Sequence, residues 1–207
     1  RNPRIEGYHA TRDVVGELTE AVRARGMRMG LYYSGALDWT FSPEPIRSAP
    51  DILVNGDPSP EYGAYAEAQY RELIERYRPS ILWNDIAYPV HGRYLRLLAD
   101  YYNAVPDGVV NDRWMQTGED LRRAMAKPLY RRLAGLVARR VMLNPAPSDP
   151  GGPFDYSTLE YNVSRKILPR PWECVRGIGN SFGYTANEPR ENFLEPADGI
   201  RLLADVA

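Results

Sequence analysis

The sequence predicts an α/β protein whose strands run parallel. Three short apolar runs, at residues 27–33, 80–83 and 109–110, alternate with segments whose apolar residues recur at helical spacing. Strands that alternate with helices of this length favour right-handed crossovers, which place successive strands parallel in one sheet. The chain of 207 residues is 43% apolar and 26% charged, which is an ordinary globular composition.

The first two helices follow from their end signals. Thr11 is expected to cap the first helix, which ends at Gly26. After the first strand comes a loop rich in Pro, Ser and Asp. Ser59 and Pro60 are typical of an N-cap followed by a proline at the first helical position. That second helix is expected to stop before Pro79, where the next strand begins.

The remaining elements are less regular. A third helix over residues 94–101 leads through a turn into the strand at 109–110. Thr117 is expected to cap a helix that Pro128 interrupts or kinks. Further on, residues 172–184 form a strand-and-turn region, and the chain ends in a last helix.

Composition excludes several function classes. The net charge is -1, from 26 basic and 27 acidic residues. The overall charge therefore gives no electrostatic attraction to nucleic acid or to an anionic membrane. One cysteine and two histidines argue against a disulfide framework or a metal centre. No apolar window reaches membrane-span length, and the first residues lack a signal-peptide core. A cytoplasmic location is therefore expected.

Polar and aromatic side chains gather where the three strands end, at residues 32–34, 83–85 and 111–114. In parallel α/β folds the carboxyl ends of the strands line one face, and that face carries the chemistry. Asp85 directly follows a buried strand, and Arg113, one strand over, is its expected ion-pair partner. The alternative is that Asp85 is only a turn former or a helix cap.

Carboxylates are the best candidates for acid and base. The chain has no nucleophile elbow, phosphate loop or zinc-protease motif. The glycines of residues 176–183 have the wrong spacing for a dinucleotide site. Paired carboxylates with aromatic residues and arginine are typical of a glycosidase site.

Five segments resemble, in the same order, those of glycoside hydrolase family 29, the α-L-fucosidases. They are GLYYSGALDW at 30–39, ILWND at 81–85, VNDRW at 110–114, STLEY at 157–161 and WECVRGIGNSFGY at 172–184. The resemblance implies a TIM-like (β/α) barrel and hydrolysis of terminal α-L-fucose with retention. It implies neither a cofactor nor a metal.

The resemblance also implies residue roles. Asp85 is similar in position to the family's nucleophile, and Glu160 to its general acid/base. A retaining glycosidase needs two such carboxyls about 5–5.5 Å apart. The implied sugar-binding residues are Tyr32, Trp83, Arg113 and, in the apolar wall around the fucose methyl, Phe182.

The chain departs from the family pattern in two places. Residues 115–153 are an insertion in what is otherwise expected to be one domain over 1–207. His9 and His91 do not lie in the family's histidine-containing sugar-binding motifs.

Four or five strands cannot close a barrel, so a truncated, incomplete TIM-like barrel with parallel strands is expected. Because its open sheet would expose apolar surface, a homo-oligomer is expected in which neighbouring chains cover that surface or complete the open barrel.

Two functions of different classes remain open. The first is a retaining exo-α-L-fucosidase that acts on a fucosylated glycan or simple fucoside. The second is a non-catalytic remnant of the barrel that binds carbohydrate or scaffolds a complex. Nucleic-acid binding by the arginine-rich insertion is a distant third, which strong salt dependence would reveal.

Overall fold

The computed structural model describes most of the chain, and it divides the chain into two compact units. The described residues are 2–42, 44–47, 51, 56–143, 152–164 and 166–206, with the side chains of 137–143 excluded. The first unit is Arg1–Ala146 and the second is Pro147–Ala207.

The first unit is built on a parallel sheet in the order β1-β2-β3. Its strands are β1 (Gly30–Ser34), β2 (Ile81–Asp85) and β3 (Val109–Val110). The register sets Tyr32 opposite Trp83 and Ser34 opposite Asp85, so the strand ends that the sequence singled out meet at one edge. The predicted parallel pairing is confirmed.

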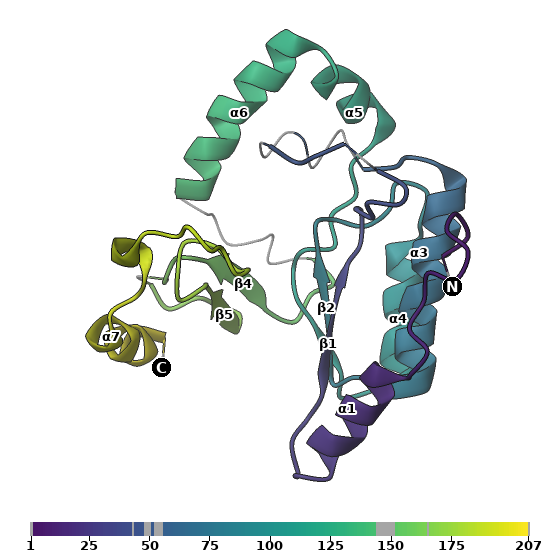
Figure 1. Ribbon diagram of the computed structural model, residues 1–207, viewed down its shortest axis with the longest axis horizontal. Helices are drawn as coiled ribbons and strands as arrows, with labels where there is room; N and C mark the ends of the chain where they lie inside the picture. The colour runs from purple at the N-terminus through teal and green to yellow at the C-terminus, as the bar shows by residue number, and fades with distance from the viewer. Residues whose placement is uncertain are drawn as a thin grey trace. The chain divides into compact units, whose positions relative to one another are not determined.

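Three helices alternate with these strands in the predicted order: α1 (Val14–Arg23), α3 (Pro60–Glu72) and α4 (Tyr94–Ala104). Figure 1 shows α3 and α4 side by side along the sheet. Helix α3 continues through a π-helical turn at Leu73–Tyr77, so the helical segment ends before Pro79 as expected. The Ser59 side chain caps α3 by accepting from the Tyr62 N–H, which confirms the predicted start.

Two predicted caps are wrong by one or two residues. Asp13, not Thr11, caps α1, because its carboxylate accepts the Gly16 N–H at 2.9 Å. Gly118, not Thr117, precedes α5 (Glu119–Met125), and Thr117 is buried instead. The expected interruption at Pro128 is confirmed, since α6 (Pro128–Leu143) starts with that proline.

The core of the first unit is rich in tyrosine and tryptophan side chains, each of which carries one polar atom. The largest fully buried side chains include Tyr62, Tyr70, Tyr88, Tyr101 and Trp114. The ring centroids of Tyr70 and Trp114 lie 5.5 Å apart, and those of Tyr88 and Trp114 lie 5.9 Å apart. Some of these polar atoms are paired within the core, as when Tyr101 donates to the Pro79 carbonyl at 2.9 Å, whereas the Tyr88 hydroxyl has no hydrogen-bond partner among the described residues.

The second unit contains a parallel pair of strands, β4 (Ser157–Glu160) and β5 (Trp172–Val175). Its helical elements are a short turn at Arg190–Asn192 and helix α7 (Pro196–Val206). Over the described residues, the parallel strands thus form open sheets, which confirms the predicted unclosed α/β fold. None of the described helices has both the length and the apolarity needed to cross a membrane.

Candidate active site

The site in the first unit is centred on Asp85, at the carboxyl end of the middle strand. Its side chain is 19% exposed. Arg113 Nη1 donates to Asp85 Oδ1 at 3.0 Å, and the Tyr32 hydroxyl donates to Asp85 Oδ2 at 2.9 Å. Each carboxylate oxygen is therefore held by a donor that comes from a different neighbouring segment. This confirms the expected ion pair between Asp85 and Arg113.

Aromatic rings form one side of this carboxylate site. Tyr32 and Trp83 are stacked, with ring centroids 5.4 Å apart and an interplanar angle of 21°. The Arg113 guanidinium lies 5.1 Å from the Trp83 centroid, which adds a cation–π contact. Burial and the charge of Asp85 raise the pKa of Tyr32 to about 12, so its hydroxyl remains a donor at neutral pH.

Beneath the site, two buried asparagines join β2 to the segment that follows β3. The Asn84 N–H donates to Asn111 Oδ1 at 3.0 Å, and Asn111 Nδ2 donates to the Asn84 carbonyl at 2.8 Å. Asn84 Nδ2 also donates to the Arg113 carbonyl at 2.8 Å. These bonds continue the pairing of the strands beyond Val110 and set the position of Arg113 against Asp85.

Sequence reasoning passed over Asn84 and Asn111. Both side chains are fully buried, and Asn84 Oδ1 also accepts from the Tyr70 hydroxyl. The sequence did contain a signal, because an asparagine follows the apolar run of two successive strands. A buried amide needs several hydrogen-bond partners, so two asparagines in equivalent positions indicate a polar network.

The backbone directly after Asp85 is strained. Ile86 and Ala87 have φ of 56° and 68°, in the left-handed region that residues with a side chain rarely adopt. Asn84 Nδ2 holds this turn by donating to the Ala87 carbonyl at 3.2 Å. Strain of about 1–3 kcal/mol per residue persists only where the surroundings enforce it, and it is concentrated at functional sites.

The second unit carries the other two predicted residues. Glu160 is exposed at the carboxyl end of β4, opposite Val175 in the register. Phe182 contacts the Tyr161 ring at a centroid distance of 5.1 Å. The Tyr161 hydroxyl donates to the Gly179 carbonyl and accepts from the Gly177 N–H. Tyr161 directly follows Glu160, and its hydrogen bonds therefore connect the end of β4 to the segment that leads to Phe182.

The six predicted site residues fall into two groups. Tyr32, Trp83, Asp85 and Arg113 are in mutual contact in the first unit, and Glu160 and Phe182 lie on neighbouring segments of the second. Over the part of the chain that the structure describes, no three His, Cys, Asp or Glu side chains are grouped to hold a metal ion.

A carboxylate held at the end of a parallel strand, beside stacked aromatic rings and an arginine, is typical of α/β glycosidases. The family model for α-L-fucosidase matches residues 4–207. The chain therefore belongs to the α-L-fucosidase family, as the five sequence segments predict.

Individual relatives support this assignment. The chain is 36% identical over 126 residues to the tissue α-L-fucosidase of Bos taurus, a match that covers 56% of this chain and 24% of that protein. It is 26% identical over 198 residues to the α-L-fucosidase of Dictyostelium discoideum, which covers 91% of this chain and 35% of that protein. The chain thus spans about a quarter to a third of the length of these relatives.

Solved structures agree with the sequence match. The Thermotoga maritima α-fucosidase is 37% identical with a TM-score of 0.68, and the match covers 94% of this chain and 37% of that one. Its complex with fucose gives 35% identity and a TM-score of 0.65, with 93% and 36% covered. This chain therefore corresponds to about a third of a fucosidase structure.

Proposed function

We propose that the chain acts as a retaining α-L-fucosidase that releases terminal α-L-fucose from fucosylated glycans or simple fucosides. The observation that carries the proposal is the fixed orientation of Asp85, whose two oxygens accept from Tyr32 and Arg113. A nucleophile needs such a defined direction of attack. Family membership supports fucose as the sugar, and the resemblance of the sequence segments implies retention.

The reaction proceeds in two displacements. In the first, Asp85 bonds to the anomeric carbon while the bond to the leaving oxygen breaks, and Glu160 gives that oxygen its proton. In the second, Glu160 takes a proton from water, the water oxygen bonds to the anomeric carbon, and Asp85 departs as a carboxylate. The anomeric configuration is inverted twice and is therefore retained.

The other site residues would bind the sugar. The stacked rings of Tyr32 and Trp83 offer an apolar surface, and Arg113 offers N–H donors for hydroxyl groups. Phe182, 58% exposed, provides an apolar contact for the fucose methyl group. Fucose is a 6-deoxy sugar, so recognition requires both an apolar wall and hydrogen-bond donors.

The proposal extends to how the chain is organised. Residues 1–207 act as one shortened catalytic domain with an insertion at about 115–153, and copies of the chain associate to cover its exposed apolar surface. Helix α6, which lies in this insertion, supports association because Leu129, Leu133 and Leu136 are each more than half exposed.

Hydrolysis of nitrophenyl α-L-fucoside tests the proposal. Asp85→Ala and Glu160→Ala should each lower kcat by at least about 10³-fold, since each removes a reacting group. Asp107→Ala is the matched control, because this carboxylate pairs with Arg28 at the surface and should leave the rate unchanged. Proton NMR of the first product should show α-L-fucose before it mutarotates.

Azide distinguishes a lost nucleophile from a lost fold. In Asp85→Ala, azide should enter the vacated space and bond to the anomeric carbon as nitrophenolate leaves, giving β-fucosyl azide. Turnover that survives Asp85→Ala would contradict the assignment of the nucleophile. Fucose binding without any turnover by the unmodified chain would instead identify a non-catalytic carbohydrate-binding protein.

A further inference from the structure

The loop after β1 begins at the candidate site. The Gly35 N–H donates to the Asp85 carbonyl at 2.9 Å, directly beyond the paired residues Ser34 and Asp85. Gly35 cannot carry a side chain, because a Cβ there would lie 2.3 Å from the Ala87 carbonyl oxygen. Trp39 follows four residues later, so it lies on the loop that leaves the strand edge where Asp85 is held.

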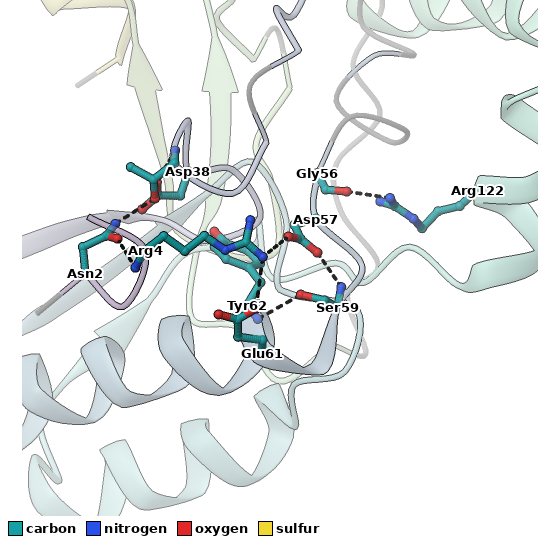
Figure 2. Close-up of polar contacts among 10 residues, drawn as sticks. Asn2, Arg4, Asp38, Gly56, Asp57, Ser59, Glu61, Tyr62 and Arg122 are labelled. Carbon is teal, nitrogen blue, oxygen red and sulfur yellow. Dashed lines mark hydrogen bonds and ion pairs between the residues drawn. The ribbon is translucent and has the colours of Figure 1, made fainter. Parts of the chain in front are cut away.

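Trp39 stands in a tight and well-bonded turn. Asp38 Oδ1 accepts the Thr40 N–H at 2.8 Å, and the Asp38 carbonyl accepts from Phe41 and Ser42 at 2.9 and 2.7 Å. Asn2 Nδ2 donates to the Thr40 hydroxyl at 2.7 Å, and Figure 2 shows Asn2 beside the Asp38 turn. The backbone on both sides of Trp39 is therefore fixed.

Phe41 anchors the same turn to the body of the unit. It is 5% exposed, and its ring centroid lies 5.1 Å from that of Tyr62 on α3. Arg4 lies 4.0 Å above the Phe41 ring and donates to Asp57 at 3.4 Å and to Glu61 at 3.0 Å. Figure 2 shows Arg4 reaching these two carboxylates.

In contrast, Trp39 itself is 62% exposed, and its neighbour Tyr8 is 51% exposed. Their ring centroids lie 5.5 Å apart at an interplanar angle of 86°, so the rings form two walls at a right angle. The segment that carries Tyr8 is tied down as well, since Asn2 Oδ1 accepts the Ile5 N–H at 3.0 Å. Exposed aromatic rings on a fixed backbone are typical of a binding surface.

We propose that Trp39 and Tyr8 form a platform for the leaving group of the substrate, binding the pyranose ring that carries the fucose. The C–H faces of a pyranose stack on an aromatic ring, and its hydroxyl groups remain in water. The inference rests on the proposed fucosidase function, because it takes fucose to be bound at Asp85. It assigns recognition of the sugar next to the fucose to Trp39 and Tyr8.

Two substrates that differ only in the leaving group test the platform. A fucosyl disaccharide presents a pyranose to the platform, whereas α-L-fucosyl fluoride presents a single atom. Trp39→Ala should lower kcat/KM for the disaccharide by about tenfold, as expected for the loss of one stacking contact. For the fluoride, kcat/KM should stay within about twofold of the value for the unmodified chain. Tyr8→Ala should act in the same direction, and Trp39→Phe should keep most of the disaccharide rate.

Tyr130→Ala, which removes a ring 48% exposed on α6, is the matched control and should change neither rate. Equal losses on both substrates, or no loss on the disaccharide, would overturn the platform. If the unmodified chain hydrolyses neither substrate, the proposed function has failed. The platform is then tested by calorimetric titration of the unmodified chain and of Trp39→Ala with the disaccharide. Binding that weakens about tenfold in Trp39→Ala would support it, and equal affinity or no binding would overturn it.

Discussion

At the scale of single residues, the candidate site depends on hydrogen bonds between side chains that are far apart in sequence. Tyr32 and Asp85 are separated by 53 positions, and Arg113 and Asp85 by 28. The Arg113 side chain is 24% exposed, so its bond to the carboxylate is partly shielded from water and is stronger than a surface pair. Such bonds restrict the carboxylate to one orientation.

Tyr32→Phe separates this orienting role from stacking. The substitution keeps the ring that stacks on Trp83 and removes the hydrogen bond to Asp85 Oδ2. We expect kcat on nitrophenyl fucoside to fall about tenfold, in line with one charged hydrogen bond, with little change in KM. Because the pKa of Tyr32 is raised to about 12, its hydroxyl stays protonated at neutral and mildly alkaline pH, so the variant should keep the shape of the pH profile there. A large rise in KM instead would show that Tyr32 mainly binds the sugar.

At the scale of elements, end signals located the helices better where the cap is followed by proline. Ser59 and Pro60 define the start of α3, since Pro60 needs no N–H partner and Ser59 caps the next donors. At α1 and α5, Thr11 and Thr117 are chemically suitable caps, but Asp13 and Gly118 occupy the positions. Several polar residues in a row make the first turn ambiguous from sequence alone.

Ser59→Ala tests the cap of α3. The Tyr62 N–H would lose its acceptor, which lies at 3.1 Å, and the free energy of unfolding should fall by about 1 kcal/mol in urea titrations. Ser59→Asp keeps an acceptor and should remain close to the unmodified chain. A loss for the aspartate variant equal to that for alanine would show that the bond to Tyr62 contributes nothing.

At the scale of the whole molecule, the buried tyrosines are expected to make the protein less stable at alkaline pH. Burial raises the pKa values of Tyr62 and Tyr88, and that of buried Tyr70 lies well above its usual range. Above about pH 10 these tyrosines ionise in the unfolded chain but keep their protons in the folded one. Unfolding then releases protons, so the free energy of unfolding should fall as the pH rises further.

The urea midpoint measured at increasing pH tests this dependence. Tyr88→Phe provides the sharper comparison, because among the described residues the Tyr88 hydroxyl has no hydrogen-bond partner. The variant should match or exceed the unmodified chain in stability at neutral pH, since removing a buried unpaired hydroxyl costs nothing, and should lose less stability above about pH 10. A midpoint that stays constant into strong alkali would contradict the expected ionisation.

The proposed association also belongs to the whole molecule. Leu129, Leu133 and Leu136 lie on one face of α6 by helical spacing, and all are exposed. We expect light scattering to show a dimer or larger assembly, and Leu133→Arg to shift it toward monomer by placing a charge in the apolar face. Leu95→Arg, at an exposed leucine of α4, is the control. A folded chain that is monomeric throughout would contradict association.

The sequence by itself determined the order of strands and helices in the first unit, the parallel pairing of its three strands and the family, because these follow from local periodicity, end signals and contiguous motifs. It also placed Asp85 at a strand end and named Arg113 as its partner. Only the tertiary structure decided that Tyr32 donates to Asp85, that Asn84 and Asn111 join the strands beneath it, and that Trp39 stays exposed. These contacts depend on the register between strands and on packing, which bring together residues that are distant along the chain.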